Sequence, residues 1–118
     1  MKTKIQRDGK VVCVLIATGL GRGNTGIMSL RTEPEYRRRG LARLAMDREE
    51  LMADGSQQRL IIAVEPDESD GGMTEEQIRD WLSRRGYKPG RHNFGSHIKP
   101  NIKPVMIREP KKWKPMKR

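Results

Sequence analysis

Apolar and β-branched residues recur along the chain in short runs that predict strands. The clearest runs cover residues 3–7, 10–18, 27–32, 59–64 and 105–108, and a weaker one covers residues 93–98. Asp8 and Gly9 separate the first two runs, and this dipeptide supplies the positive φ angles that a tight hairpin needs. The second and fourth runs are apolar on both faces, so we expect them inside a sheet, the fourth in a parallel position.

A first amphipathic segment follows Gly40. Its apolar residues, among them Leu41, Leu44 and Ala45, fall on one face at helical spacing. The helix is expected to stop at the Asp-Gly-Ser sequence of residues 54–56, where Gly55 can adopt the left-handed conformation of a helix end. Strand 27–32, this helix and strand 59–64 together predict a right-handed βαβ unit.

A second helix is predicted to start at Thr74 and to end before Gly86. Gln77 stands three residues after Thr74, which is the spacing of a capping box. The apolar residues Ile78, Trp81 and Leu82 form its predicted buried face.

Residues 19–26 contain four glycines and predict a mobile linker. These glycines precede a strand instead of opening a helix, so they do not predict a dinucleotide-binding loop.

The composition predicts one basic domain of modest core size. Of the 118 residues, 34% are hydrophobic and the net charge is +10, so the surface attracts nucleic acid, nucleotides or acidic proteins. We expect a domain over residues 1–110 and a basic tail over residues 111–118. Cys13 is the only cysteine and the longest apolar stretch, residues 11–17, is too short to cross a bilayer. A cytoplasmic protein is therefore expected. His92 and His97 lack companions at ligand spacing, so no metal site is expected.

The junction between strand 27–32 and the first helix has the ingredients of a phosphate site. Three consecutive arginines, Arg37, Arg38 and Arg39, precede Gly40. A helix N-terminus offers backbone N–H donors and the positive end of the helix dipole, while glycine lets a ligand approach the backbone. An ordinary helix start with solvated arginines is the alternative interpretation.

The spacing Arg37-x-x-Gly40-x-Ala42 resembles the pyrophosphate loop of GNAT-type N-acetyltransferases, and Pro34-x-Tyr36 resembles the turn before it. Gly86-Tyr87, directly after the second helix, is a further point of resemblance. The resemblance implies an α/β (α+β) fold: a mixed, mostly antiparallel sheet with a central strand-loop-helix-strand unit and two main helices. It covers roughly residues 4–87, with a closing hairpin to residue 108.

By the same resemblance, acetyl-CoA is the cosubstrate. The residues implied to bind it are Leu30, Arg31, Thr32, Arg37, Arg38, Arg39, Gly40, Leu41, Ala42 and Arg43. Glu65 and Glu33 are weak candidates for the base that deprotonates the amine.

The chain departs from the family in two places. It begins at what resembles the family's second strand, so part of the acceptor side is expected to be absent and the edge of strand 3–7 uncovered. A tyrosine that protonates the leaving thiolate often stands four residues before the glycine, and here that position is Leu82.

Two functions follow from these observations. The first is an N-acetyltransferase that acylates an amine of a protein or small molecule. The alternative is a catalytically degenerate GNAT-like protein, of phage or mobile-element type, that contacts nucleic acid or a host protein through its basic surface and tail. A homodimer or a stable protein partner is expected because an open sheet edge invites pairing.

Overall fold

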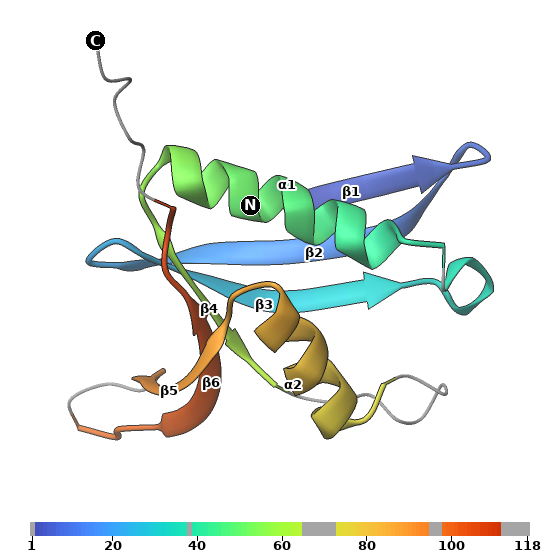
Figure 1. Cartoon of the computed structure of the whole chain (residues 1–118). Coiled ribbons are helices and arrows are strands. Elements are labelled where there is room, and N and C mark those ends of the chain that lie inside the picture. The colour runs from blue at the N-terminus through green and yellow to red at the C-terminus, as the bar shows by residue number, and fades with distance from the viewer. Residues whose placement is uncertain (1, 38, 65–72, 95–97, 112–118) are drawn as a thin grey trace, which may run out of the picture.

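The computed structural model describes residues 2–37, 39–64, 73–94 and 98–111, which form a six-stranded sheet and two helices (Figure 1). The strands are β1 (Lys2–Arg7), β2 (Lys10–Gly21), β3 (Asn24–Thr32), β4 (Arg59–Ala63), β5 (Lys88–Asn93) and β6 (Ile102–Arg108). The helices are α1 (Leu41–Gly55) and α2 (Glu75–Arg84), and a short 3-10 helix, η1 (Pro34–Tyr36), precedes α1. Sheet order is β1-β2-β3-β4-β6-β5, and among these neighbours β3 and β4 alone run parallel. The predicted mixed, mostly antiparallel sheet is confirmed.

Tight hairpins join the first three strands. Asp8 (φ 54°) and Gly9 (φ 77°) make the predicted turn between β1 and β2. The predicted linker over residues 19–26 is wrong, because β2 continues to Gly21 and β3 begins at Asn24. Cross-strand pairing such as Thr18 with Gly26 holds the glycine backbone in the sheet, which local propensity does not reveal.

Both helices pack on one face of the sheet. Figure 1 shows α1 lying over β1 and β2, with α2 closer to β4. Ala45 and Met46 of α1 belong to the same buried cluster as Leu82 of α2, and Leu15 and Leu60 contribute from the sheet. The opposite face carries no helix in the part of the chain that the structure describes.

The last two strands differ from the prediction. The strand expected over residues 93–98 lies earlier, at Lys88–Asn93, and residues 95–97 lie outside the described structure. Pro89 is tolerated because β5 is an edge strand that pairs with β6 alone among the described strands. Gly90 is required by packing, since an added Cβ would stand 2.6 Å from Cδ1 of Ile107. β6 also begins three residues before the predicted strand, at Ile102.

The helix ends follow local chemistry with one exception. Thr74 and Gln77 form the predicted capping box, in which the Thr74 hydroxyl accepts from the Gln77 N–H at 3.2 Å and the Gln77 amide oxygen accepts from the Thr74 N–H at 2.9 Å. Gly86 is left-handed, with φ 93°. Gly55 instead remains inside α1, and Gln57 takes the left-handed conformation with φ 53°.

Lys111, predicted to open the tail, is attached to the end of α1. Its N–H donates to Asp54 Oδ1 at 2.9 Å, and its carbonyl accepts from Gln57 Nε2 at 3.1 Å. Residues 112–118 lie outside the described structure, so the division between domain and tail stays a prediction. No helix among the described residues is long and apolar enough to cross a membrane.

Glu49 is a buried carboxylate on the sheet-facing side of α1. It is 3% exposed, and its Oε2 has no hydrogen-bond partner among the described residues. Burial raises the pKa of Glu49 above its ordinary value of 4.5. Because the pKa of Glu49 is higher in the folded than in the unfolded protein, any favourable contribution of this carboxyl group to stability is complete below pH 4.5 and is lost as the pH rises.

We therefore expect Glu49→Met to increase the free energy of unfolding at pH 7 by about 1–3 kcal/mol, because it removes an unsatisfied buried charge. At pH 4 the gain should shrink, since the wild-type carboxyl is then largely protonated. Urea denaturation of both proteins at the two pH values measures the difference. A gain that is the same at both pH values would contradict a role for the charge.

Candidate functional site

The parallel strands β3 and β4 diverge after a short paired region. Their register runs from Asn24 opposite Arg59 to Ile27 opposite Ile62. β3 then continues to Thr32, five residues beyond the last pair, while β4 ends at Ala63. A wedge-shaped opening between the two strands results, and the second half of β3 forms one of its walls.

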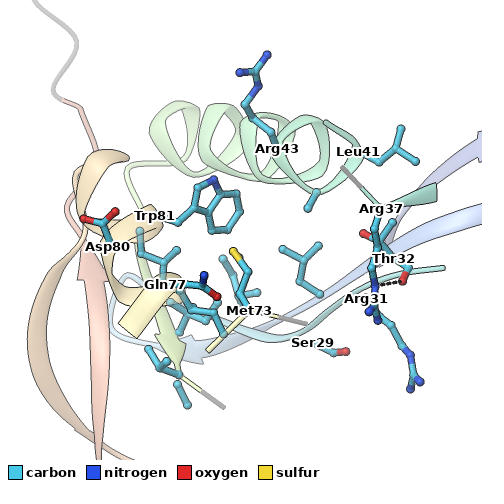
Figure 2. A pocket seen from close by; sticks show the side chains of 18 of the residues that line it. Ser29, Arg31, Thr32, Arg37, Leu41, Arg43, Met73, Gln77, Asp80 and Trp81 are labelled. Carbon is cyan, nitrogen blue, oxygen red and sulfur yellow. Dashed lines mark hydrogen bonds between the residues drawn. The ribbon is translucent and has the colours of Figure 1, made fainter. Parts of the chain in front are cut away.

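A groove of about 1380 Å³ occupies this opening and extends between the two helices. One wall comes from β3 and the start of α1, and the other from the end of β4 and from α2. Figure 2 shows Met73, Gln77 and Trp81 on the α2 side, facing Thr32, Arg37 and Leu41 across the groove.

The start of α1 lies at the β3 end of this groove. Gly40 is the N-cap residue, with φ 74°, and no side chain caps the helix. The first intrahelical bond is donated by the Leu44 N–H to the Gly40 carbonyl at 3.0 Å, so helix geometry directs the N–H groups of Leu41, Ala42 and Arg43 away from the helix body. The first turn contains no acidic residue. The site therefore offers backbone donors and a positive helix end without a competing carboxylate.

Gly40 is favoured here by its left-handed backbone conformation, which a residue with a side chain rarely adopts. A Cβ at this position would point into open space, with no atom of the described structure within 4 Å. That open space is where a ligand approaching the helix start would lie.

The arginines around the helix start have different environments. Nε of Arg37 donates to the Thr32 carbonyl at 3.4 Å, and the Arg39 guanidinium lies over the Tyr36 ring at 4.9 Å. Figure 2 shows the side chains of Arg43 and Arg31 leaving the groove in opposite directions. Among the arginines that the structure describes, Arg37 and Arg39 are thus the best placed beside the helix start.

The structure brings the predicted cofactor residues to this one groove. Those that line it are Leu30, Arg31, Thr32, Arg37, Arg39, Gly40, Leu41, Ala42 and Arg43. Arg38 lies outside the described residues. That these residues bind acetyl-CoA stays a prediction, which their common location supports.

Of the two carboxylates predicted as weak base candidates, the described structure places only Glu33, and it places Glu33 away from the groove. Glu33 is exposed and is not among the residues lining the groove, while its backbone N–H donates to the Val12 carbonyl at 2.8 Å. Glu65 lies outside the described residues. In the described part of the groove Asp80 supplies a carboxylate, but its Oδ2 pairs with Arg84 at 2.9 Å.

No tyrosine hydroxyl stands at the α2 wall in the described structure. Leu82 is fully buried and packs in the core, as predicted. Tyr87 donates its hydroxyl to Glu50 Oε2 at 3.1 Å, away from the groove lining, and burial raises the pKa of Tyr87 far above its ordinary value. Tyr36 lines the groove, but its hydroxyl donates to Asp8 Oδ2 at 3.0 Å.

Several groove residues were missed by the sequence analysis. They are Met28, Ser29, Ile62, Ala63, Met73, Gln77, Asp80, Arg84, Phe94 and Lys103. Trp81 was predicted as a core residue, yet it is only half-buried, and the Arg85 guanidinium lies 5.4 Å from its ring. The helical pattern marks Trp81 as apolar but does not show that its face borders an opening.

Comparison with solved structures identifies the architecture. The ribosomal-protein-S18-alanine N-acetyltransferase from Escherichia coli superposes with a TM-score of 0.68 at 13% identity, over 92% of this chain and 68% of that one. A GNAT family acetyltransferase from Elizabethkingia anophelis, solved with acetyl-CoA bound, gives 0.66 at 10% identity, over 92% and 74%. The chain has a GNAT-type fold. The PaiA N-acetyltransferase from Thermoplasma acidophilum, in complex with coenzyme A, gives 0.67 at 9% identity and shares the GNAT-type architecture.

The likeness is one of fold. The match to the Thermoplasma enzyme covers 92% of this chain but only 60% of that enzyme. No protein-family model matches the sequence, and the search of curated proteins finds no significant match. The predicted GNAT resemblance is therefore confirmed at the level of the fold, and the activity follows as a proposal.

Proposed function

We propose that this protein is an acetyl-CoA-dependent N-acetyltransferase that acylates an amine of a protein or small molecule. The observation that carries the proposal is the uncapped start of α1 at Gly40, which opens into the groove between the diverging strands of a GNAT-type fold. Two structural neighbours of this fold are described with coenzyme A or acetyl-CoA bound.

Each part of the groove suits one part of acetyl-CoA. The N–H groups of Leu41, Ala42 and Arg43, with Arg37 and Arg39 nearby, would hold the pyrophosphate. The backbone of residues 30–32 would run beside the pantetheine arm. Bound acetyl-CoA supplies a thioester that the acceptor amine attacks, and positioning of the two reactants lowers the barrier by several kcal/mol.

Proton transfer is the weak part of this site. Leu82 has no proton to donate, and the hydroxyl of Tyr36 is engaged with Asp8. A positioned acid typically contributes on the order of 100-fold to 10,000-fold. We therefore expect slow turnover, with the thiolate protonated by water or by the incoming amine.

Acetyl transfer is tested by incubating the protein with acetyl-CoA and a panel of amines, and by measuring the free thiol released. Slow, amine-dependent release is the expected result. The alternative function, a degenerate binding protein, predicts no release above the uncatalysed rate with any amine, together with binding to nucleic acid or protein.

Leu82→Tyr should raise the rate of transfer if α2 presents this position to the thioester sulfur. The added ring crowds a buried position, at a cost of about 1–3 kcal/mol in stability. Leu82→Phe is the matched control, because it adds the ring without the hydroxyl. A rate that rises equally in both variants, or in neither while both remain folded, would show that the proton follows another path.

The homodimer and the partner protein stay predictions. β1 forms an edge of the sheet in the described structure, and it carries the exposed cations Lys2, Lys4 and Arg7. Charges on an edge strand oppose its pairing with an identical strand. Light scattering at micromolar concentrations distinguishes a monomer from a dimer.

A further inference from the structure

Charges are segregated between the two layers of the protein. The six strands contain no aspartate or glutamate, and the acidic residues that the structure describes stand in helices or connecting segments. The cations within the strands are Lys2, Lys4, Arg7, Lys10, Arg31, Arg59, Lys88, Arg91, Lys103 and Arg108. The sheet is therefore a positively charged layer, partly balanced by acidic helices on one side.

Strand register shows which of these cations face away from the helices. Leu15 and its partner Leu30 pack toward the helices, so the neighbouring pairs on β2 and β3 face the other way. One such row is Lys4, Val14 and Arg31 across β1, β2 and β3. A second row is Lys2, Ile16 and Ser29. Both rows place cations beside an apolar floor on the helix-free face.

The same face continues beyond the opening between β3 and β4. Met106 packs toward the helices opposite Ile62, so Val105 and, two residues before it, Lys103 face the other side. Lys103 pairs in register with His92 of β5, and Lys88 follows at the other end of that strand. Cations thus occur on β1, β3, β6 and β5, across a width of roughly 24 Å at the usual strand spacing.

Aromatic rings accompany the cations at this end of the face. His92 and Phe94 contact each other edge to face, with ring centroids 5.0 Å apart, and both are half-buried. Met28, on β3, is 54% exposed. Flat apolar groups beside lysines are the combination by which open sheet faces bind single-stranded nucleic acid, the rings stacking on bases and the cations pairing with phosphates.

We propose that the helix-free face of the sheet binds single-stranded nucleic acid. Charge complementarity supports this occupant, because cations on β1, β3, β6 and β5 together attract a polyanion. The rings of His92 and Phe94 favour nucleic acid over an acidic peptide, since bases supply surfaces on which they stack. Lys2, Lys4 and Lys88 lie outside the groove lining, whereas Arg31, Phe94 and Lys103 also line the groove, so the proposed face adjoins the groove at the opening between β3 and β4. The proposal itself does not require acetyl transfer.

Fluorescence anisotropy with a labelled 20-nucleotide single-stranded RNA tests the proposal, with the full chain titrated at several salt concentrations. The double variant Lys2→Gln/Lys4→Gln should bind more weakly. Its salt slope should be smaller by about 1.4, because each phosphate contact on a single strand contributes ~0.7 to the slope. Phe94→Ala should weaken binding at least about fivefold through lost stacking. Arg48→Gln/Arg84→Gln is the matched control, because it removes the same charge from exposed positions on the helices.

We expect the wild-type protein to bind the RNA. The sheet double variant should lose much of this affinity, and the helix control should lose much less of it. Equal losses in the two double variants would overturn the proposal, since net charge alone would then explain binding. Absence of binding at low salt, or equal affinity for poly-glutamate, would overturn it as well. A thermal shift with CoA in Lys2→Gln/Lys4→Gln that equals the wild-type shift would show that the β1 end of the face acts independently of the groove.

Discussion

Gly40→Asp is expected to abolish the stabilisation of the protein by CoA. Wild type at a CoA concentration about 100 times the dissociation constant should gain ~2.7 kcal/mol, visible as a rise in melting temperature. In the variant, a carboxylate stands at the start of α1, where the structure leaves open space. A like charge about 4 Å from a phosphate costs ~4 kcal/mol near a protein surface, which corresponds to on the order of 1000-fold in affinity.

The variant itself should remain folded. Aspartate tolerates the left-handed conformation better than most residues, and a negative charge at a helix N-terminus is favourable. Gly9→Asp is the matched control, because Gly9 is also left-handed, also has no atom within 4 Å of an added Cβ, and is not among the residues that line the groove. If both variants keep the wild-type thermal shift with CoA, the helix start does not hold the pyrophosphate.

Asp54→Ala is expected to have the largest effect on stability. Arg108 is 6% exposed, and its guanidinium forms two hydrogen bonds with Asp54, of 2.8 and 3.0 Å. Removing the carboxylate leaves a buried cation without its partner, which typically costs 3–5 kcal/mol. Because the Asp54 side chain is 20% exposed, we expect about 3 kcal/mol, measured by urea denaturation at pH 7.

Asp80→Ala is the control for this substitution. Asp80, like Asp54, is a helix residue that pairs with an arginine. Both side chains of the Asp80–Arg84 pair are largely exposed, so a loss of at most about 1 kcal/mol is expected. Similar losses of stability in the two variants would show that burial of Arg108 does not increase the cost of removing its partner.

The pH dependence of the stability change should also distinguish Asp54→Ala from Glu49→Met. The Arg108 hydrogen bonds lower the pKa of Asp54 below its ordinary value of 3.8. Its stabilising contribution is therefore complete above pH 3.8 and is lost as the pH falls through the folded-state pKa. Asp54→Ala should consequently differ less from wild type as the pH is lowered below 3.8, whereas Glu49→Met differs most at neutral pH.

Local chemistry predicted the parts of this fold that depend on neighbouring residues. The Asp8-Gly9 turn, the left-handed Gly86 and the capping box at Thr74 each follow from a few adjacent side chains. The same holds for the helix start at Gly40, because its glycine and the preceding arginines lie together in the sequence.

Features that depend on distant residues escaped prediction. The segment from Gly19 to Gly26 is a hairpin because sheet pairing holds it, and β5 tolerates Pro89 because of its edge position. Asp54 and Arg108 are 54 residues apart, so their pairing has no local signal. The far wall of the groove was missed for the same reason, since Trp81 reaches it only through the packing of α2.

Calorimetric titration of the wild-type protein with acetyl-CoA tests the central claim most directly. The account predicts saturable binding of one acetyl-CoA per chain, which Gly40→Asp abolishes and Gly9→Asp retains. Absence of measurable heat and of any thermal shift at millimolar acetyl-CoA would contradict it, and would leave a GNAT-type fold that does not use its groove for this cosubstrate.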